Sequence, residues 1–302
     1  METVRDPELE QLDLEQVLKR PLKSQQLLPA HHPGQASYIW RIESAEGFQI
    51  VRTNRFLTPP GEDFWAGSFH LFGALTTDLT RLAVINRWLQ PKLPWAVPQI
   101  QALVPFLGRY FAVVDWMAGT ALADFDHLTE DSLHTFGSAL ARLHQCQFDV
   151  FGPPGILEDV SRGTPARQFA EALIATQTLL QERFYPDEPW AQPDDGFTFE
   201  GPMAPILLDM DPTQFLASGG SIRAVVDTEL YVIGPPQLEL VGLEYLLSPA
   251  AAAAFRVGYE AIAPLPALAP VRRPFRRLLR ALSFQGPEPW EAWMDWPIRL
   301  PT

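Results

Sequence analysis

The spacing of apolar and polar positions changes several times along the chain. Residues 7–20 place leucines and a valine at roughly helical intervals, which predicts a short amphipathic helix. Residues 35–42 and 48–53 instead have the composition of β-strands and are separated by the turn-prone segment 44–47. The early part of the chain is therefore predicted to form an antiparallel hairpin.

Helices and strands continue to alternate further along. Helical spacing returns over residues 75–90, and two strand-like runs follow at 100–104 and 110–114. Beyond residue 120 the pattern is mainly helical, over 129–147, 165–184, 238–262 and 269–283. Three short apolar segments interrupt these helices, at 206–209, 214–217 and 222–227.

Together these patterns predict an α+β fold of two lobes. A small, antiparallel β-rich lobe spans residues 1–114, and a larger, mainly helical lobe spans residues 115–302, with a hinge at 115–119. Ligands often bind in the cleft between two lobes. The segments that would border this cleft are therefore the first place to expect functional residues.

Composition narrows the range of functions. The chain has 302 residues, and 23 basic against 36 acidic side chains give a formal net charge of −13. This charge argues against nucleic-acid binding, which needs a basic face. The most apolar stretch, 248–270, contains Arg256, Glu260 and prolines, so no membrane span is expected. A single cysteine and an acidic first segment without an apolar core predict a soluble, cytoplasmic protein.

The strongest chemical signal lies in the β-like stretch of the helical half. Asp209 ends one apolar segment, Gln214 opens the next, and Asp227 ends the third. Gly219 and Gly220 permit a tight hairpin, so two carboxylates and an amide oxygen can meet at one end of a small sheet. One carboxylate could accept a proton from a hydroxyl. The other carboxylate and the amide oxygen could hold a hard cation such as Mg²⁺.

Plainer interpretations of these residues are also open. Aspartates are common turn formers, so Asp209 and Asp227 could each simply cap a turn. Glu229 could be a carboxylate close to a metal ion, or it could be a solvated side chain. The basic run 272–280 is expected to form a solvated helix face, although it could also bind a phosphate.

The order and spacing of Asp209, Gln214 and Asp227 resemble the aminoglycoside phosphotransferase family, which has the protein-kinase-like fold and is similar to choline and fructosamine kinases. The resemblance extends over most of the chain. Residues 113–119 are similar to the hinge of that family, and residues 136–144 to its Leu-Ala-x-Leu-His helix.

The resemblance implies transfer of a phosphoryl group from ATP, with Mg²⁺, to a hydroxyl of a small molecule such as an aminoglycoside, choline or a sugar amine. It implies that Asp209 is the catalytic base and that Gln214 and Asp227 hold Mg²⁺. It also implies nucleotide contacts in a phosphate-covering turn, the following strand and the hinge, by Gly34, Gln35, Arg52, Val114 and Trp116.

Several positions depart from the family pattern. Leu207 stands where the family has a loop histidine, Gln214 where it has asparagine, and Arg52 where it has lysine. The helical glutamate that pairs with that lysine would fall near Leu82, and Asp78 is the nearest acidic residue. These departures leave a second function open, that of a catalytically degenerate kinase-like protein with a binding or regulatory role.

Overall fold

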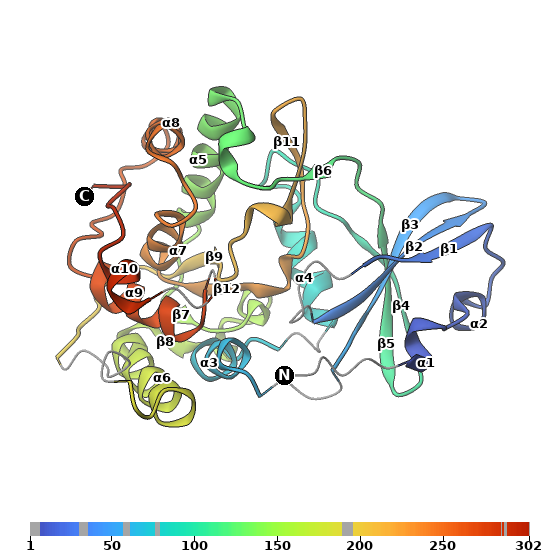
Figure 1. Ribbon diagram of the computed structural model, residues 1–302, viewed down its shortest axis with the longest axis horizontal. Helices are drawn as coiled ribbons and strands as arrows, with labels where there is room; N and C mark the ends of the chain where they lie inside the picture. Colours follow the sequence, from blue (N-terminus) through green and yellow to red (C-terminus); the bar gives the residue numbers. More distant parts are fainter. Residues whose placement is uncertain are drawn as a thin grey trace.

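The computed structural model describes residues 7–29, 36–56, 61–75, 79–188, 196–284, 286 and 289–301. A small lobe built on an antiparallel sheet lies beside a larger lobe of helices and short strands (Figure 1). This arrangement confirms the predicted α+β architecture. Within the described parts of the chain, no helix is long and apolar enough to span a membrane.

The small lobe contains a five-stranded sheet with the order β1-β2-β3-β5-β4. Its strands are β1 (Ser24–Leu27), β2 (Ser37–Ser44), β3 (Gly47–Asn54), β4 (Ile100–Phe106) and β5 (Arg109–Asp115). The predicted hairpin β2–β3 is present, and the two later strands that were predicted, β4 and β5, also pair antiparallel. The central strand β3 therefore lies between β2 and β5, where a side chain can face the other lobe.

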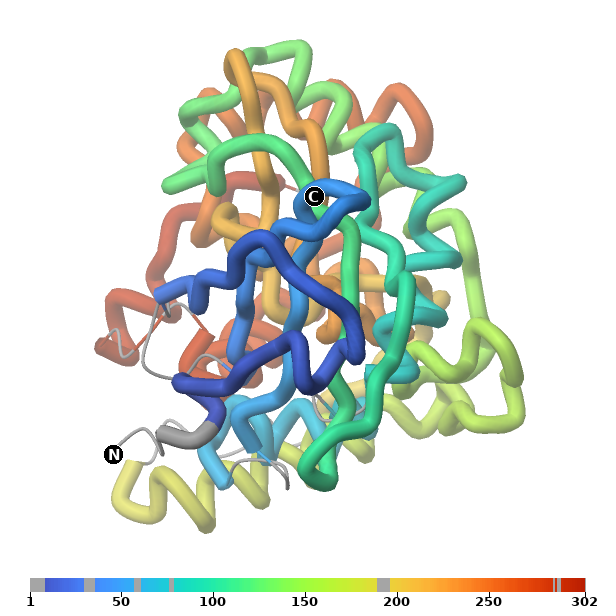
Figure 2. The backbone as a smooth tube through the Cα atoms, turned by 90° about the vertical axis from the view of Figure 1, so that its right-hand side faces the viewer, coloured from blue at the N-terminus to red at the C-terminus, as the bar shows by residue number. Residues whose placement is uncertain are grey.

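The outer face of this sheet is covered by the start of the chain. The predicted single helix consists of two short ones, α1 (Pro7–Glu10) and α2 (Leu14–Leu18), because Asp13 caps a new helix at the Glu15 N–H, 3.0 Å away. Apolar side chains of both helices bury Trp40 and Ile42. Figure 2 shows this segment lying across the side of the small lobe that faces away from the helical lobe.

Two helices follow the first hairpin, α3 (Asp63–Phe72) and α4 (Leu79–Leu89). Helix α3 packs mainly against α6 of the large lobe. Helix α4 contacts β4 on one side and the short turn Thr228–Leu230 of the large lobe on the other. Helix α4 therefore borders both lobes.

The large lobe contains the helices α5 (Glu130–His144), α6 (Phe169–Phe184), α7 (Pro236–Leu243), α8 (Pro249–Glu260), α9 (Arg272–Ala281) and α10 (Trp290–Met294). The helix predicted over 238–262 is two helices, because Pro249 disfavours a helical conformation at the residue before it. That residue, Ser248, instead caps α8 by accepting a hydrogen bond from Ala251 N–H at 3.2 Å.

The short strands of the large lobe form separate small sheets. Strand β9 (Ala204–Leu207) pairs with β12 (Tyr231–Gly234). Strands β10 (Phe215–Ser218) and β11 (Ser221–Val225) form the predicted hairpin, and β6 (Thr120–Ala121) joins its edge. A further pair consists of β7 (Val150–Phe151) and β8 (Thr164–Pro165). The prediction of one sheet for the whole stretch was therefore wrong, because β9 pairs with β12 instead of the hairpin.

The basic run of helix α9 is largely buried, so the prediction of a solvated face was wrong. Arg272, Arg276 and Arg277 are all buried. Arg272 Nε and Arg276 Nη2 lie 3.1 and 3.0 Å from one carboxylate oxygen of Glu244, which is itself fully buried. Paired charges can lie inside a protein because each satisfies the other.

Candidate active site

A pocket of about 300 Å³ lies between the two lobes. The candidate residues from the sequence that line it are Arg52, Val114, Trp116, Gln214 and Asp227. Two further candidates, Gly34 and Gln35, lie outside the described residues. Strands β3 and β5, the hinge, and the β10–β11 hairpin thus bring together residues that are far apart in the sequence.

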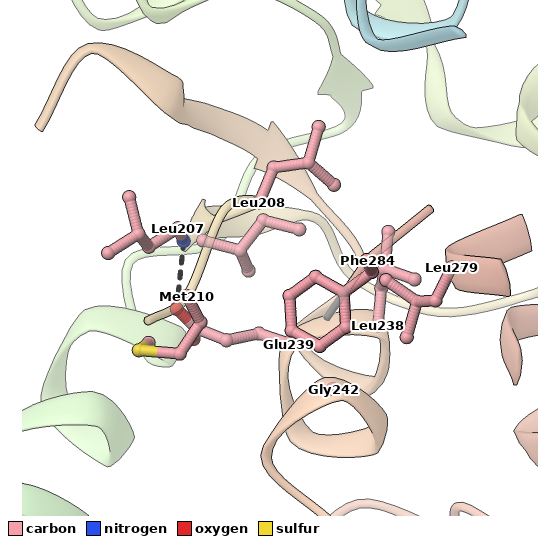
Figure 3. Close-up of a pocket in the computed structure, with 9 residues that line it drawn as sticks. Leu207, Leu208, Met210, Leu238, Glu239, Gly242, Leu279 and Phe284 are labelled. Atoms are coloured by element: carbon pink, nitrogen blue, oxygen red, sulfur yellow. Dashed lines mark hydrogen bonds between the residues drawn. The ribbon is translucent and has the colours of Figure 1, made fainter. Parts of the chain in front are cut away.

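The loop that carries Asp209 begins at the end of β9 and is held by hydrogen bonds to the helices packed behind it. Leu207, the residue in place of the family histidine, is buried, and its N–H donates to Glu239 Oε1 at 2.8 Å (Figure 3). Glu239 Oε2 lies 2.7 Å from His144 Nε2, and His144 Nδ1 lies 2.8 Å from the hydroxyl of Tyr259. These buried bonds hold the start of the loop to α5, α7 and α8.

Asp209 itself is a partly buried carboxyl group in a negative environment. Burial raises the pKa of Asp209 well above its ordinary value of 3.8. The carboxylates of Asp227, Asp211 and Glu229 raise this pKa further. A carboxylate with a raised pKa binds a proton more strongly, which suits a group that must accept one.

Gln214 ends a 3₁₀ turn, Pro212–Gln214, that is closed by two reciprocal hydrogen bonds. Asp211 Oδ1 accepts from Thr213 N–H at 2.8 Å, and Gln214 Oε1 accepts from Asp211 N–H at 3.2 Å. Val226 N–H also donates to the main-chain oxygen of Gln214 at 2.7 Å. The side-chain oxygen of Gln214 is therefore already bonded within its own turn.

Asp227 follows β11 in a left-handed backbone conformation, with φ 59° and ψ 48°. Aspartate adopts this conformation more easily than most residues. Its side chain is 47% exposed and lines the pocket. The next residue, Thr228, donates a hydrogen bond to Asn86 Oδ1, and Asn86 Nδ2 donates to Pro98 O at 2.7 Å. The segment after β11 is thus bonded directly to helix α4.

Arg52 on β3 lies opposite two carboxylates of the other lobe. Its Nη1 is 3.2 Å from Asp227 Oδ1, and its Nη2 is 2.5 Å from Glu229 Oε1 and 2.9 Å from Ser37 Oγ. Burial alone would lower the pKa of Arg52, but the two carboxylates outweigh this effect and raise the pKa above its ordinary value. Arg52 therefore stays charged inside the cleft.

Glu229 is a largely buried partner of Arg52, so the solvated alternative for this residue was wrong. Its side chain is only 13% exposed. Burial raises the pKa of Glu229 to about 7, while the charge of Arg52 opposes this rise and the charge of Asp227 adds to it. The sequence alone did not single out the pairing of Glu229 with Arg52, because the two residues are far apart along the chain. It did not single out the contact of Arg52 with Ser37 either.

The hinge forms the other end of the pocket. Asp115 fixes the end of β5, because its carboxylate accepts hydrogen bonds from Gln99 N–H at 2.9 Å and from Gln101 Nε2 at 2.7 Å. Val114 and Trp116 on either side of it line the pocket. Trp116 is 40% exposed. The hinge thus presents apolar side chains and main chain to a bound molecule.

Among the residues that the structure describes, no group of three or more histidine, cysteine or acidic side chains is arranged to hold a metal ion. Asp78, the nearest acidic alternative on the predicted helix, lies outside the described residues, and Leu82 lines the pocket without offering a charge.

Comparison with known proteins identifies the family. The family model of the phosphotransferase enzyme family matches residues 60–287, which is most of the chain. The chain belongs to this family. Membership agrees with the site, because the matched region contains Asp209, Gln214 and Asp227 in one segment. Among curated protein sequences, none matches the chain significantly.

Solved structures of low sequence identity share the fold. The chain is similar to an aminoglycoside 2'-phosphotransferase-IIIa in complex with GDP, with a TM-score of 0.58, 13% identity, and coverage of 90% of this chain and 87% of that chain. A putative fructosamine-3-kinase from Haemophilus somnus 129PT gives a TM-score of 0.55 at 13% identity, covering 93% and 92%.

A third similar structure is a thermostable mutant of an aminoglycoside phosphotransferase in a ternary complex with AMP-PNP and hygromycin B. Its TM-score is 0.51 at 15% identity, and the match covers 93% of this chain and 92% of that chain. These similarities confirm the predicted protein-kinase-like, two-lobe fold. They also confirm the resemblance to aminoglycoside phosphotransferases and fructosamine kinases.

Proposed function

We propose that the protein is an ATP-dependent phosphotransferase that acts on a hydroxyl of a small molecule. The observation that carries this proposal is the convergence of Arg52, Asp227 and the hinge on one pocket between the lobes. Family membership supports phosphoryl transfer as the reaction. The complexes of similar proteins with GDP and AMP-PNP support a nucleotide as the donor.

The pocket suggests an orientation for the nucleotide. The base would lie against Val114 and Trp116 at the hinge, and the phosphates would reach Arg52 at the other end. Gly34 and Gln35 precede β2 and would cover the phosphates. Arginine binds phosphate oxygens with a planar fork of N–H donors, so it can replace a lysine as the cationic group although its geometry differs.

The residues present fit a Mg²⁺ ion that accompanies the nucleotide. Asp227 offers a partly exposed carboxylate at the pocket wall, and Mg²⁺ is usually held by one or two carboxylates together with phosphate oxygens. Gln214 Oε1 already accepts from Asp211 N–H, so only its second lone pair is left to join the ion. When bound, the ion neutralises phosphate charge and orients the phosphates.

In the proposed reaction, Asp209 orients the acceptor hydroxyl and accepts its proton. The hydroxyl oxygen then forms a bond to the γ-phosphorus, and the bond to the leaving ADP breaks. Positioning supplies most of the rate enhancement in such a reaction. The buried bonds of Glu239 to Leu207 and His144 hold the start of the loop that carries Asp209, and so contribute to that positioning.

The test is Asp209→Asn, assayed as acceptor-dependent ADP formation with aminoglycosides, choline and sugar amines. We expect the wild type to respond to at least one acceptor and D209N to lose activity at least about 100-fold, the range of a lost proton acceptor. Asp131→Asn, an exposed aspartate at the start of α5, is the matched control. Equal turnover by D209N and the wild type would contradict the role of Asp209.

A second candidate is a catalytically degenerate, kinase-like protein with a binding or regulatory role. Two observations favour it: Gln214 Oε1 is occupied by Asp211 N–H, and Arg52 is already paired with two carboxylates. Such a protein would bind a nucleotide without help from Mg²⁺. The metal dependence of nucleotide binding therefore separates the two candidates.

A further inference from the structure

Arg52 is the cationic side chain among the described residues that line the pocket. It extends from β3 of the small lobe, whereas both of its carboxylate partners follow β11 in the large lobe. The ion pairs therefore cross from one lobe to the other. This arrangement raises the question of which partner orients the guanidinium for a ligand.

Helix α4 does not supply the orienting carboxylate. Its described span, Leu79–Leu89, contains neither aspartate nor glutamate. Leu82 and Asn86 are its residues that line the pocket. Leu82 is apolar, and Asn86 uses its side chain to bond Thr228 and the carbonyl of Pro98. Among the described residues, the carboxylates that reach Arg52 therefore come from another element, the segment after β11.

The two carboxylates that face Arg52 differ in their surroundings. Glu229 is buried and lies 2.5 Å from Nη2, which also donates to Ser37 Oγ at 2.9 Å. Asp227 lies at a longer distance, 3.2 Å from Nη1, and is 47% exposed at the pocket wall. Glu229 and Ser37 thus hold one nitrogen of the fork in place, and the other nitrogen points to the side that a ligand can reach.

We propose that Glu229 is a positioning residue that holds Arg52 from the large lobe, so that Nη1 is presented to the phosphate of a nucleotide in the cleft. This inference rests on the proposed function. A guanidinium that is already held in place loses less conformational entropy when a phosphate binds to it. The carboxylate thus supplies, from the segment after β11, the support that α4 lacks.

The test measures ATP binding by isothermal titration calorimetry, once with EDTA and once with Mg²⁺. We expect Glu229→Leu to weaken ATP binding about tenfold under both conditions, the scale of one lost charge-assisted contact. Glu229→Gln keeps an oxygen that can accept from Nη2 and should bind ATP within about twofold of the wild type. The control Glu46→Gln removes a carboxylate from the exposed pair with Arg20 in the small lobe, away from the pocket lining, and should leave ATP binding unchanged.

A second comparison shows whether the effect passes through Arg52. In an Arg52→Met background, Glu229→Leu should weaken ATP binding no further, because residues that act as one unit are not additive. If Glu229→Leu does not fold, as judged by circular dichroism, Glu229→Asp takes its place. Aspartate keeps the charge, but its shorter side chain places the carboxylate farther from Nη2. Glu229→Asp should therefore weaken ATP binding about as much as Glu229→Leu.

Four results would overturn the inference. Tighter ATP binding by E229L would mean that Glu229 competes with the phosphates for Arg52. A loss seen only with Mg²⁺ would make Glu229 a metal ligand instead. Unchanged binding by E229L, with a wild type that binds ATP, would refute the positioning role and leave the proposed function standing. A wild type that binds no nucleotide would refute both.

Discussion

Two acidic residues of the site are in surroundings that disfavour a negative charge. Asp209 and Glu229 both have raised pKa values because burial and neighbouring carboxylates disfavour their charged forms. Arg52 partly neutralises this negative charge, since it pairs with both Asp227 and Glu229. Carboxylates kept close together in this way are typical of functional sites rather than of stabilising ones.

This crowding predicts that Asp209→Asn stabilises the protein. Because the folded pKa lies above the unfolded value of 3.8, the native state binds more protons between these two values, and stability falls as pH rises through the folded pKa. At pH 8, D209N should therefore unfold at a temperature higher by about 1 to 3 °C than the wild type. Thermal unfolding from pH 5 to pH 8 measures this difference.

The difference should shrink as the pH is lowered, because the carboxyl of the folded wild type then gains its proton and the charge that disfavours the native state is lost. The exposed Asp131→Asn should show no such pH-dependent gain. A lower midpoint for D209N at pH 8 would contradict the prediction, because it would mean that the negative charge stabilises the native loop.

The spacing of Asp209, Gln214 and Asp227 is local, so the sequence could predict their shared loop and hairpin. The pairing of Arg52 with Glu229 could not be predicted, because it depends on how two lobes meet. The bond between Gln214 Oε1 and Asp211 N–H was missed for another reason. From the residue types alone, a glutamine that closes a capping box cannot be told apart from one whose amide oxygen binds a metal ion.

Helices and strands with a local sequence pattern could be predicted, whereas those that depend on distant partners could not. The hairpin β2–β3, the strands β4 and β5, and helices α5, α6 and α9 were predicted because their periodicity is local. Strand β12 was missed, since its partner β9 lies 24 or more residues earlier and its four residues are all buried without alternation. Helix α3 was missed too, because aromatic residues and Gly67 mask its helical pattern.

At the scale of elements, helices α5 and α8 approach closely because of glycines. A Cβ on Gly137 would lie 2.0 Å from the main-chain oxygen of Phe255, which cannot move without shifting α8. Gly137→Ala should therefore lower the free energy of unfolding by about 1–3 kcal/mol or more, as overpacking does. Chemical denaturation monitored by tryptophan fluorescence measures the loss.

Gly242 provides the matched control, since it also lies in a helix, α7. A Cβ there would first meet Phe284 at 3.5 Å, an ordinary contact. Gly242→Ala should be neutral or raise the free energy of unfolding by about 0.4–1 kcal/mol, because alanine restricts the unfolded chain. Equal losses in both variants would show that the close approach of α5 and α8 is not what makes Gly137 necessary.

For the whole molecule, part of the contact between the two lobes runs through the site itself. Arg52 pairs with Asp227 and Glu229, and Thr228 bonds to Asn86 on α4. A ligand that binds in this cleft contacts both lobes and therefore stabilises the folded state as a whole. Cleft occupancy should consequently be visible in the global unfolding of the protein.

We expect Mg·ATP to raise the unfolding midpoint by several degrees. A ligand at ~100 times its dissociation constant adds about 2.7 kcal/mol to the free energy of unfolding. ATP with EDTA should give a smaller shift, because Asp227 at the pocket wall repels the phosphates unless a cation lies between them. Asp227→Asn should remove this dependence on Mg²⁺. An equal shift with and without Mg²⁺ in the wild type would favour the degenerate alternative, in which the cleft still binds a nucleotide but no longer assembles the charges that phosphoryl transfer requires.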